Sequence, residues 1–217
     1  MNALATLHFD PLDTTVAVAC IDTPLGPMHV ASHAAGVCAA VFDDRREALE
    51  PRLRRLFGPF FHVTAGDPLD VGRRLAGYFS GRLDALSDVP LATAATPMQR
   101  RVWAMVSALP AGTLTTYAAL ADGLGMPRAQ RAVGVCLASN PVPLFIPCHR
   151  VVAASGALAS HPGGVVRKRW LLRHEGALDV ADLAAARRRR SRLAVARRAL
   201  DPRETVDVVD LPRVVGY

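Results

Sequence analysis

The sequence predicts an α/β (α+β) fold in which a strand-rich N-terminal half precedes a helical C-terminal half. Three short apolar runs with turn residues between them lie within residues 14–42, a strong helix start lies at Thr96, and two short helices with a tight glycine-containing turn follow residue 117. We therefore predict an antiparallel sheet domain over residues 1–90, a helical domain with a helix-turn-helix over 96–176, and a basic helical extension over 177–217.

The chain has 217 residues, of which 51% are apolar and 21% charged. This composition excludes a disordered chain, and the length suffices for one large domain or two small ones with cores of their own. No window of 18 uninterrupted apolar residues occurs, and residues 1–10 lack the basic and apolar regions of a signal peptide. The sequence therefore predicts a cytoplasmic protein with no membrane partner.

The net charge of +7 and the pI near 10 come almost entirely from arginine, because Lys168 is the only lysine. Such an excess indicates a polyanionic partner such as nucleic acid, although arginine-for-lysine replacement in an arginine-rich proteome gives the same composition. Many of these arginines crowd residues 187–198. The extension is therefore either a solvated tail or a source of phosphate contacts.

The N-terminal half is predicted to be a scaffold, because no charged constellation in it suggests catalysis. Its strand-like runs predict an antiparallel meander and cover residues 14–22, 28–32 and 37–42. Helical patterns cover 45–57 and 69–79, a short strand fits 60–64, and 85–95 has the composition of a linker.

The four cysteines form no C-x-x-C pair and no zinc-finger spacing with histidines. Neither a disulfide framework nor a metal site is predicted, and no cofactor is implied. Cys20 and Cys38 lie in strand-like apolar runs, where cysteine acts as a small hydrophobic residue, so we expect both to be inert and buried. Cys136 falls on an apolar helical stripe and is expected in the core.

The helical half begins with a capping box, in which Thr96 is the N-cap, Pro97 occupies the first helical position and Gln99 closes the box. This helix ends before Pro110, and shorter helices are predicted over 117–124 and 128–139. The last of them has an apolar face toward the core and an outer face that combines two arginines with small side chains, namely Arg128, Arg131, Gly134, Val135 and Ala138. A helix with its side chains is about 10–12 Å across and the minor groove of B-DNA about 6 Å wide, so only such a face suits that groove.

Cys148 is the strongest candidate for a chemical role, because it lies between Pro147 and His149 at the end of an apolar strand-like run. A thiol attacks as the thiolate and needs a base or a positive field to lose its proton. Neighbouring side chains on a strand point to opposite faces, so contact with His149 requires a bend or a bridging water. Glu175 follows a predicted helix and supplies a carboxylate to orient His149. On this pattern alone, hydrolases and redox enzymes stay open.

Several segments resemble O6-alkylguanine-DNA alkyltransferases in order and spacing. They include Arg-Ala-Val-Gly at 131–134, Asn-Pro at 140–141 and Pro-Cys-His-Arg-Val at 147–151, and further segments cover residues 96–103, 112–117 and 168–175. The match is close over 96–176 and looser over 14–82. The resemblance implies a ribonuclease-H-like N-terminal sheet domain and a winged-helix-like C-terminal domain with a helix-turn-helix.

The resemblance also implies a function, namely DNA repair by direct reversal of damage. Cys148 would irreversibly take the alkyl group from O6-alkylguanine, with O4-alkylthymine as a second candidate substrate, in double-stranded DNA bound through its minor groove. Each molecule would act once as a methylated-DNA–protein-cysteine methyltransferase, without a cofactor. We expect a monomer when free of DNA and leave cooperative binding on DNA open.

The resemblance assigns a role to each matching residue. Cys148 is the nucleophile, His149 its base through water, Glu175 the residue that orients His149, Asn140 the brace of the turn, and Tyr117 the hydrogen-bond partner of the flipped guanine. The implied DNA contacts, with Arg131 replacing the flipped base in the stack, are Arg131, Arg128, Thr116, Ala132, Gly134 and Val135. The implied substrate pocket is lined by Pro143, Val151, Trp103, Ser155, His161 and Pro162.

Two pocket residues depart from the family pattern. His161 stands where tyrosine is usual, and Pro162 stands where family members offer a backbone N–H to the guanine oxygen, which proline lacks. Either a neighbouring amide substitutes or the leaving group is less stabilised, and His161 is either a donor itself or a plain surface histidine. Gln130 and Val135 are bulkier than the alanine and glycine expected there, which bears on how deeply the helix enters the groove.

Two other functions stay open on the sequence. One is a sensor that binds alkylated bases in DNA and recruits other repair factors without transferring; Pro162 keeps it open, and retention of Cys148 opposes it. The other is a thiol hydrolase that uses Cys148, His149 and Glu175 and turns over without DNA.

Overall fold

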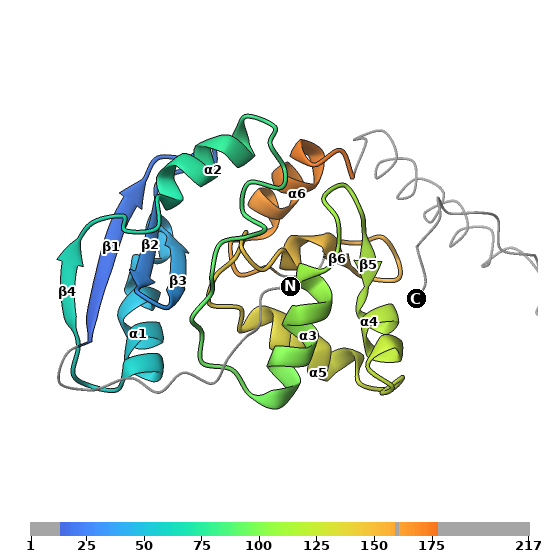
Figure 1. Ribbon diagram of the computed structural model, residues 1–217. Helices are drawn as coiled ribbons and strands as arrows, with labels where there is room; N and C mark the ends of the chain where they lie inside the picture. Colours follow the sequence, from blue (N-terminus) through green and yellow to red (C-terminus); the bar gives the residue numbers. More distant parts are fainter. Residues whose placement is uncertain (1–13, 159–160, 178–217) are drawn as a thin grey trace, which may run out of the picture.

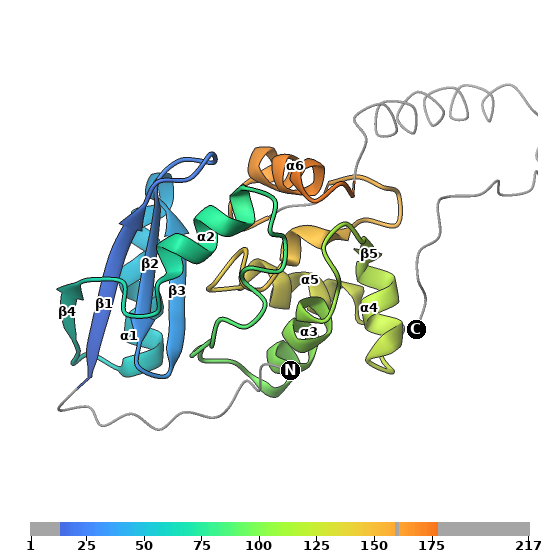
Figure 2. The same ribbon diagram turned by 45° about the horizontal axis from the view of Figure 1, so that its top comes forward.

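A computed structural model describes residues 14–158 and 161–177 of the chain (Figure 1). The strands of the N-terminal half lie on one side of the molecule and the helices of the C-terminal half on the other, in two views 45° apart (Figure 2). Among the described residues no helix is long and apolar enough to cross a membrane. The predicted helix of the extension, with its arginines at 187–198, lies outside the described residues.

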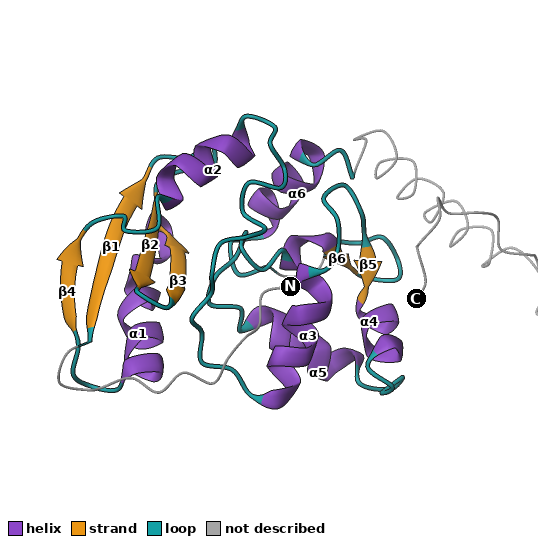
Figure 3. Ribbon diagram, in the orientation of Figure 1, coloured by secondary structure: helices purple, strands orange, loops and turns teal. Residues whose placement is uncertain are grey.

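The main sheet has four strands in the order β3-β2-β1-β4 (Figure 3). The strands are β1 (Thr15–Ile21), β2 (Met28–His33), β3 (Gly36–Phe42) and β4 (His62–Ala65). The first three form the predicted antiparallel meander, whereas β4 pairs with β1 in parallel. A parallel pair needs a crossover rather than a tight turn. The short 3-10 helix η1 (Asp43–Ala48) and α1 (Leu49–Phe57), between β3 and β4, supply that crossover.

Both faces of this sheet are covered, which is why every residue of β3 is buried. On one face, Cys38 and Ala39 of β3 pack with Leu53 and Phe57 of α1. On the other, Phe42 joins a continuous core that includes α2 (Val71–Phe79) and the C-terminal helices. The sheet thus separates two cores, and a register shift opposite Ala31 and Ser32 lets two consecutive residues of β3, Cys38 and Ala39, join the same one.

Cys38 is buried, as predicted, but the same prediction is wrong for Cys20, which is exposed. Strand β4 pairs with β1 only as far as Val18, so Cys20 lies beyond the end of its neighbouring strand. Its sulfur lies 4.0 Å from Nε2 of His29 on β2. An apolar run predicts a strand, but the length of the neighbouring strand decides whether its last residues are covered.

The predicted linker is docked onto the outer edge of β3. Pro90 accepts a hydrogen bond from the backbone N–H of Val37 at 2.8 Å, and Val37 accepts one from Ala92 at 2.9 Å. Gly36 has φ +140°, and a Cβ there would lie 2.5 Å from the carbonyl oxygen of Pro90. The linker therefore covers a strand edge that would otherwise be open to pairing with another chain.

The C-terminal half consists mainly of short helices around the same core. The predicted capping box starts α3 (Pro97–Ser107): Thr96 accepts from the N–H of Gln99, and Gln99 accepts from the N–H of Thr96. The helices α4 (Tyr117–Gly123) and α5 (Gln130–Ala138) follow at the predicted positions, and α6 (Val165–His174) is the last. The strands β5 (Thr115–Thr116) and β6 (Val151–Val152) form a small parallel pair.

Trp103 of α3 joins two helices of this core. Its side chain is 1% exposed, and its indole N–H donates to the carbonyl oxygen of Cys136 in α5 at 2.8 Å. We expect Trp103→Phe to lower the free energy of unfolding by about 1–3 kcal/mol, because it leaves a cavity and removes a buried hydrogen bond. Urea denaturation measures this loss. The control Trp170→Phe, at a half-buried position, should lose less; an equal loss would contradict this role for Trp103.

Candidate functional site

The loop between α5 and β6 carries Cys148 and is held in place from both halves of the chain. The side-chain amide of Asn140 donates to the carbonyl oxygen of Ile146 at 2.9 Å, and its oxygen accepts from the N–H of Val142 at 3.0 Å. The carbonyl oxygen of Pro141 accepts from the N–H of Ala40 in β3 and from the guanidinium of Arg52 in α1. The sheet therefore braces the segment that positions the thiol.

This loop is not the strand-like run that the apolar sequence suggested. It turns back on itself, with Pro143 bridging Ile146 and Leu144 at φ +78°, and it ends in a 3-10 turn, η2 (Cys148–Arg150). Prolines lack the N–H that a strand ladder needs, and the side chain of Asn140 takes up backbone groups instead. The η2 turn bends the chain at Cys148 and His149, as a strand would not.

Cys148 lies in this turn as a buried thiol, only 3% exposed. Its sulfur accepts a hydrogen bond from Nδ2 of Asn140 at 3.1 Å. Burial raises the pKa of the Cys148 thiol to about 11, although the Asn140 hydrogen bond and the positive charge of Lys168 oppose that rise. The thiol is therefore protonated near neutral pH, and its reaction as a nucleophile requires a base.

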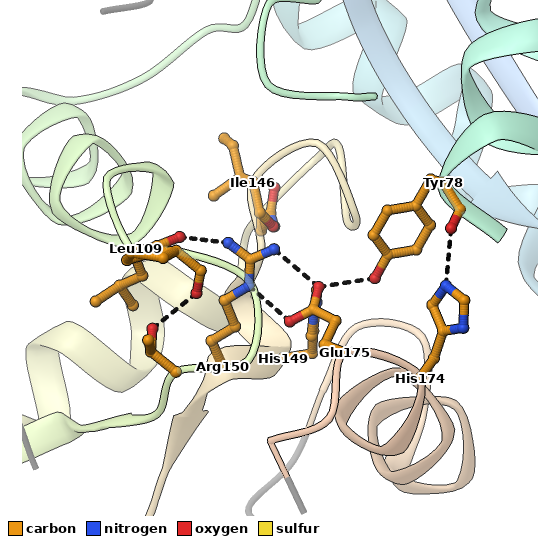
Figure 4. A network of polar contacts seen from close by, with 10 residues as sticks. Tyr78, Leu109, Ile146, His149, Arg150, His174 and Glu175 are labelled. Carbon is orange, nitrogen blue, oxygen red and sulfur yellow. Dashed lines mark hydrogen bonds and ion pairs between the residues drawn. The ribbon is translucent and has the colours of Figure 1, made fainter. Parts of the chain in front are cut away.

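His149 is fully buried and paired with a carboxylate (Figure 4). Its Nε2 donates to Oε1 of Glu175 at 2.9 Å, an arrangement that leaves the lone pair on Nδ1. Burial lowers the pKa of His149 below its ordinary value of 6.5, and the Glu175 carboxylate only partly opposes this. The imidazole is thus neutral near pH 7 and able to accept a proton at Nδ1.

Glu175 is the centre of a buried polar network (Figure 4). Besides His149 it accepts two hydrogen bonds from the guanidinium of Arg150 and one from the hydroxyl of Tyr78, each at 2.8 Å. Burial opposes ionisation, but the hydrogen bonds from His149 and Arg150 outweigh it and hold the pKa of Glu175 well below its usual range. Arg150 also donates to the carbonyl oxygen of Leu109.

Three residues of this site were not among those predicted. Arg150 lies within the segment that resembles the alkyltransferases and could have been found there, whereas Tyr78 was assigned only to the core stripe of its helix. Lys168 is buried, and its ammonium donates to the carbonyl oxygen of Val151 at 2.5 Å. Burial lowers the pKa of Lys168 to about 8, and the proximity of Cys148 opposes that fall. Lys168 is the only lysine and lies within residues 168–175, which also resemble the alkyltransferases, so the same segment match could have indicated it.

The predicted faces of α5 are confirmed. Val133, Cys136 and Leu137 are buried in the core. The other side of the helix is open, with exposed side chains at Arg131, Ala132, Val135 and Ala138 and a half-buried Gly134, whereas the exposed Arg128 lies two residues before the helix begins.

Helix α4 places an aromatic ring between this surface and the thiol. Its N-cap, Thr116, accepts from the N–H of Ala119. Tyr117 follows and is half-buried, and a Cβ on Gly134 would lie 3.8 Å from its ring. Burial and the nearby Cys148 raise the pKa of Tyr117. The phenol therefore stays protonated near neutral pH and can donate a hydrogen bond.

The residues predicted to line the substrate pocket differ in how deeply they are buried. Pro143 and Val151 are buried, Ser155 and Pro162 are half-buried, and Trp103 lies in the core against α5. His161 is 7% exposed, so the plain surface histidine is excluded. The two amides after Pro162 are engaged within the loop: the N–H of Gly163 donates to Nδ1 of His161, and that of Gly164 donates to its carbonyl oxygen. The described residues contain no cluster of metal-ligating side chains.

Comparison with known proteins agrees with the site. Residues 97–177 match the family model described as 6-O-methylguanine DNA methyltransferase, DNA binding domain. A methylated-DNA--protein-cysteine methyltransferase of Salmonella typhimurium is 41% identical over 167 residues, which cover 73% of this chain and 94% of the relative. The protein of the same name from Mycobacterium tuberculosis is 36% identical over 166 residues, covering 75% and 94%.

Solved structures are also similar to this chain over most of its length. The crystal structure of Mycobacterium tuberculosis O6-methylguanine methyltransferase has 34% identity and a TM-score of 0.63, and covers 78% of this chain and 98% of that one. The structure of Mycobacterium tuberculosis OGT in complex with DNA has 33% identity and a TM-score of 0.63, covering 77% and 98%. The chain belongs to the family of methylated-DNA--protein-cysteine methyltransferases.

Proposed function

We propose that this protein repairs DNA by direct reversal, transferring the methyl or alkyl group of O6-alkylguanine irreversibly to its own Cys148. The observation that carries the proposal is the buried Cys148 thiol next to a His149–Glu175 pair, in a chain whose relatives are named cysteine methyltransferases. Neither a sensor without transfer nor a thiol hydrolase is favoured by these names. O4-alkylthymine is a second candidate substrate.

The transfer begins with removal of the thiol proton. The proton passes from Sγ of Cys148 through a water to Nδ1 of His149, and the imidazolium that forms is stabilised by its hydrogen bond to the Glu175 carboxylate. The thiolate then attacks the alkyl carbon in line, forming a C–S bond as the C–O bond breaks. The electron pair of that bond stays with the guanine, where Tyr117 donates a hydrogen bond.

The product is a thioether, which water does not cleave, so each molecule acts once. The low exposure and high pKa of Cys148 suit this chemistry, because a thiol that is used only once must not be consumed by other electrophiles. Asn140 braces the turn and hydrogen-bonds the sulfur. We place Pro143, Val151, Ser155, His161 and Pro162 around the base and Trp103 behind them.

We propose that the exposed face of α5 enters the minor groove of double-stranded DNA. Arg131 would take the place of the flipped base, and Arg128, Thr116, Ala132, Gly134 and Val135 would line the contact. The support is the combination of small side chains with the exposed Arg131 on this face and the exposed Arg128 just before the helix. Val135 is 68% exposed and stands out from the helix, so groove entry is shallower there than with glycine.

We also propose the finer description of the domains. A ribonuclease-H-like unit would cover residues 1–90, in which an antiparallel meander, a helix and a strand parallel to the first follow in order. A winged-helix-like unit would cover 96–176, with α4 and α5 as its helix-turn-helix. Because one hydrophobic core contains residues of both units, the first unit would support the second. The free protein would be a monomer.

Mass spectrometry of the protein tests the transfer itself. After incubation with duplex DNA that contains O6-methylguanine, we expect the intact protein to gain one methylene unit and a peptide map to place it on Cys148. Cys148→Ser should gain nothing and still bind the duplex, because the hydroxyl is a far weaker nucleophile. Cys20→Ser, at an exposed position, is the matched control and should be modified fully. Catalytic turnover, or a methyl group on another residue, would contradict the proposal.

The pH dependence of the single-turnover rate tests the base. Protonation of Nδ1 removes the acceptor, and burial holds the pKa of His149 below 6.5. We therefore expect the rate of methyl transfer not to fall from pH 8 down to 6.5, where protonation of Lys168 favours the thiolate, and to fall only at lower pH. Rapid-quench measurements on an O6-methylguanine duplex give this profile. A midpoint above pH 6.5 would show that His149 is not the base.

Arg131 can be tested with two substrates. Flipping a base costs a few kcal/mol, and an inserted side chain offsets part of it. We expect Arg131→Ala to slow transfer from duplex DNA by about tenfold or more, the equivalent of about 1.4 kcal/mol, and to leave transfer from the free base O6-methylguanine unchanged. Arg169→Ala, an exposed arginine on α6, should change neither. Equal losses with both substrates would point instead to damage at the reaction centre.

A further inference from the structure

Two buried ring nitrogens on His149 and the neighbouring His161 have no hydrogen-bond partner among the described residues, namely Nδ1 of His149 and Nε2 of His161. Their imidazoles meet edge to face, with ring centroids 6.3 Å apart and planes at 77°. Buried polar atoms are nearly always paired, by protein or by an ordered water, because leaving them unpaired is unfavourable. Two such atoms on neighbouring rings therefore indicate a common partner.

The tautomers of the two rings are complementary. Nδ1 of His161 accepts from the N–H of Gly163 at 3.0 Å, so the proton of this ring is on Nε2. His149 donates from Nε2 to Glu175, so its Nδ1 carries a lone pair. One unpaired donor thus lies beside one unpaired acceptor, and a water that accepts from the first and donates to the second satisfies both.

The His161 ring is held firmly enough to place such a water. A Cβ on Gly163 would lie 3.1 Å from both Cε1 and Nδ1 of His161 and 3.1 Å from the ring of Phe42, and the guanidinium carbon of Arg167 lies over the Phe42 ring, 4.0 Å from its centroid. Burial lowers the pKa of His161 to about 3, and the neighbouring His149, Lys168 and Arg167 favour the same direction. The ring therefore stays a neutral donor at any pH at which the protein works.

We propose that His161 is a positioning residue that holds the water through which Cys148 passes its proton to His149. The Nε2–H of His161 donates to the water oxygen, and the water donates to Nδ1 of His149. When the thiol ionises, its proton joins the water oxygen as one water proton moves to Nδ1, which leaves a thiolate, a water and an imidazolium paired with Glu175. His161 keeps its own proton throughout. The inference rests on the proposed function, which supplies the reaction.

The test compares single-turnover transfer from O6-methylguanine duplex DNA in three variants between pH 7 and 9. General bases contribute about 10²–10⁴-fold, and a residue that only positions the water should contribute less, so we expect His161→Leu to be about tenfold slower at pH 7. Its rate should then rise relative to the wild type as the pH increases, because hydroxide replaces the relay, whereas the wild-type rate should not rise, because Lys168 loses its charge near pH 8 and no longer favours the thiolate. His161→Gln, whose amide can donate from a similar place, should recover much of the loss. His62→Leu, at an exposed position on β4, is the control.

The outcomes separate the inference from the proposed function. If the wild-type protein transfers no methyl group, the proposed function fails. If the wild type transfers and His161→Leu has the same rate and profile, only the inference fails. If the rate falls equally at every pH, His161 acts on the guanine oxygen or the packing and the inference also fails.

A second measurement uses only the wild-type protein and therefore does not depend on whether His161→Leu folds. Nitrogen-15 NMR of the wild-type imidazoles should show a protonated Nε2 and an unprotonated Nδ1 for His161, with a magnetisation exchange between its Nε2–H and a bound water. The opposite tautomer would overturn the proposal.

Discussion

The site depends on one constraint, the burial of the Glu175 carboxylate. Removing a carboxylate from water costs several kcal/mol, which only close ionic and hydrogen-bond partners offset. Here Arg150, His149 and Tyr78 provide them, from η2 and from α2 in the other half of the chain. Because loss of one partner of a buried pair costs about 3–5 kcal/mol, these segments are locked to the end of α6.

This constraint determines the chemistry of the neighbours. Glu175 fixes the tautomer of His149, and burial keeps both that ring neutral and the thiol of Cys148 protonated. Before the reaction the thiol and its base are therefore both neutral. They become a thiolate and an imidazolium only during the transfer. The protonated ammonium of Lys168 adds a positive charge that favours the thiolate. A nucleophile that can be used once is in this way kept unreactive until a substrate reaches it.

Local patterns predicted much of the fold. The capping box of α3, the meander of β1 to β3 and the two faces of α5 follow from residue spacing and turn chemistry within short segments, and the structure has each of them. The run before Cys148 was misassigned as strand-like, because its composition is apolar although three prolines and the Asn140 side chain impose a turn. Cys20 was misplaced in the core, because burial depends on how far β4 extends.

The sequence by itself determined which chemistry is present: a cysteine next to a histidine, a carboxylate to orient it, and a helix with an arginine-bearing face of small side chains. Only the tertiary structure decided the burial, the hydrogen-bond partners and the pKa values of these groups. The hydroxyl of Tyr78 reaches Glu175 across 97 residues of chain, and His161 turns inward against His149 rather than outward to solvent. Contacts between segments distant in sequence leave no local pattern, since they are set by which faces share a core. Burial and pKa follow from those contacts.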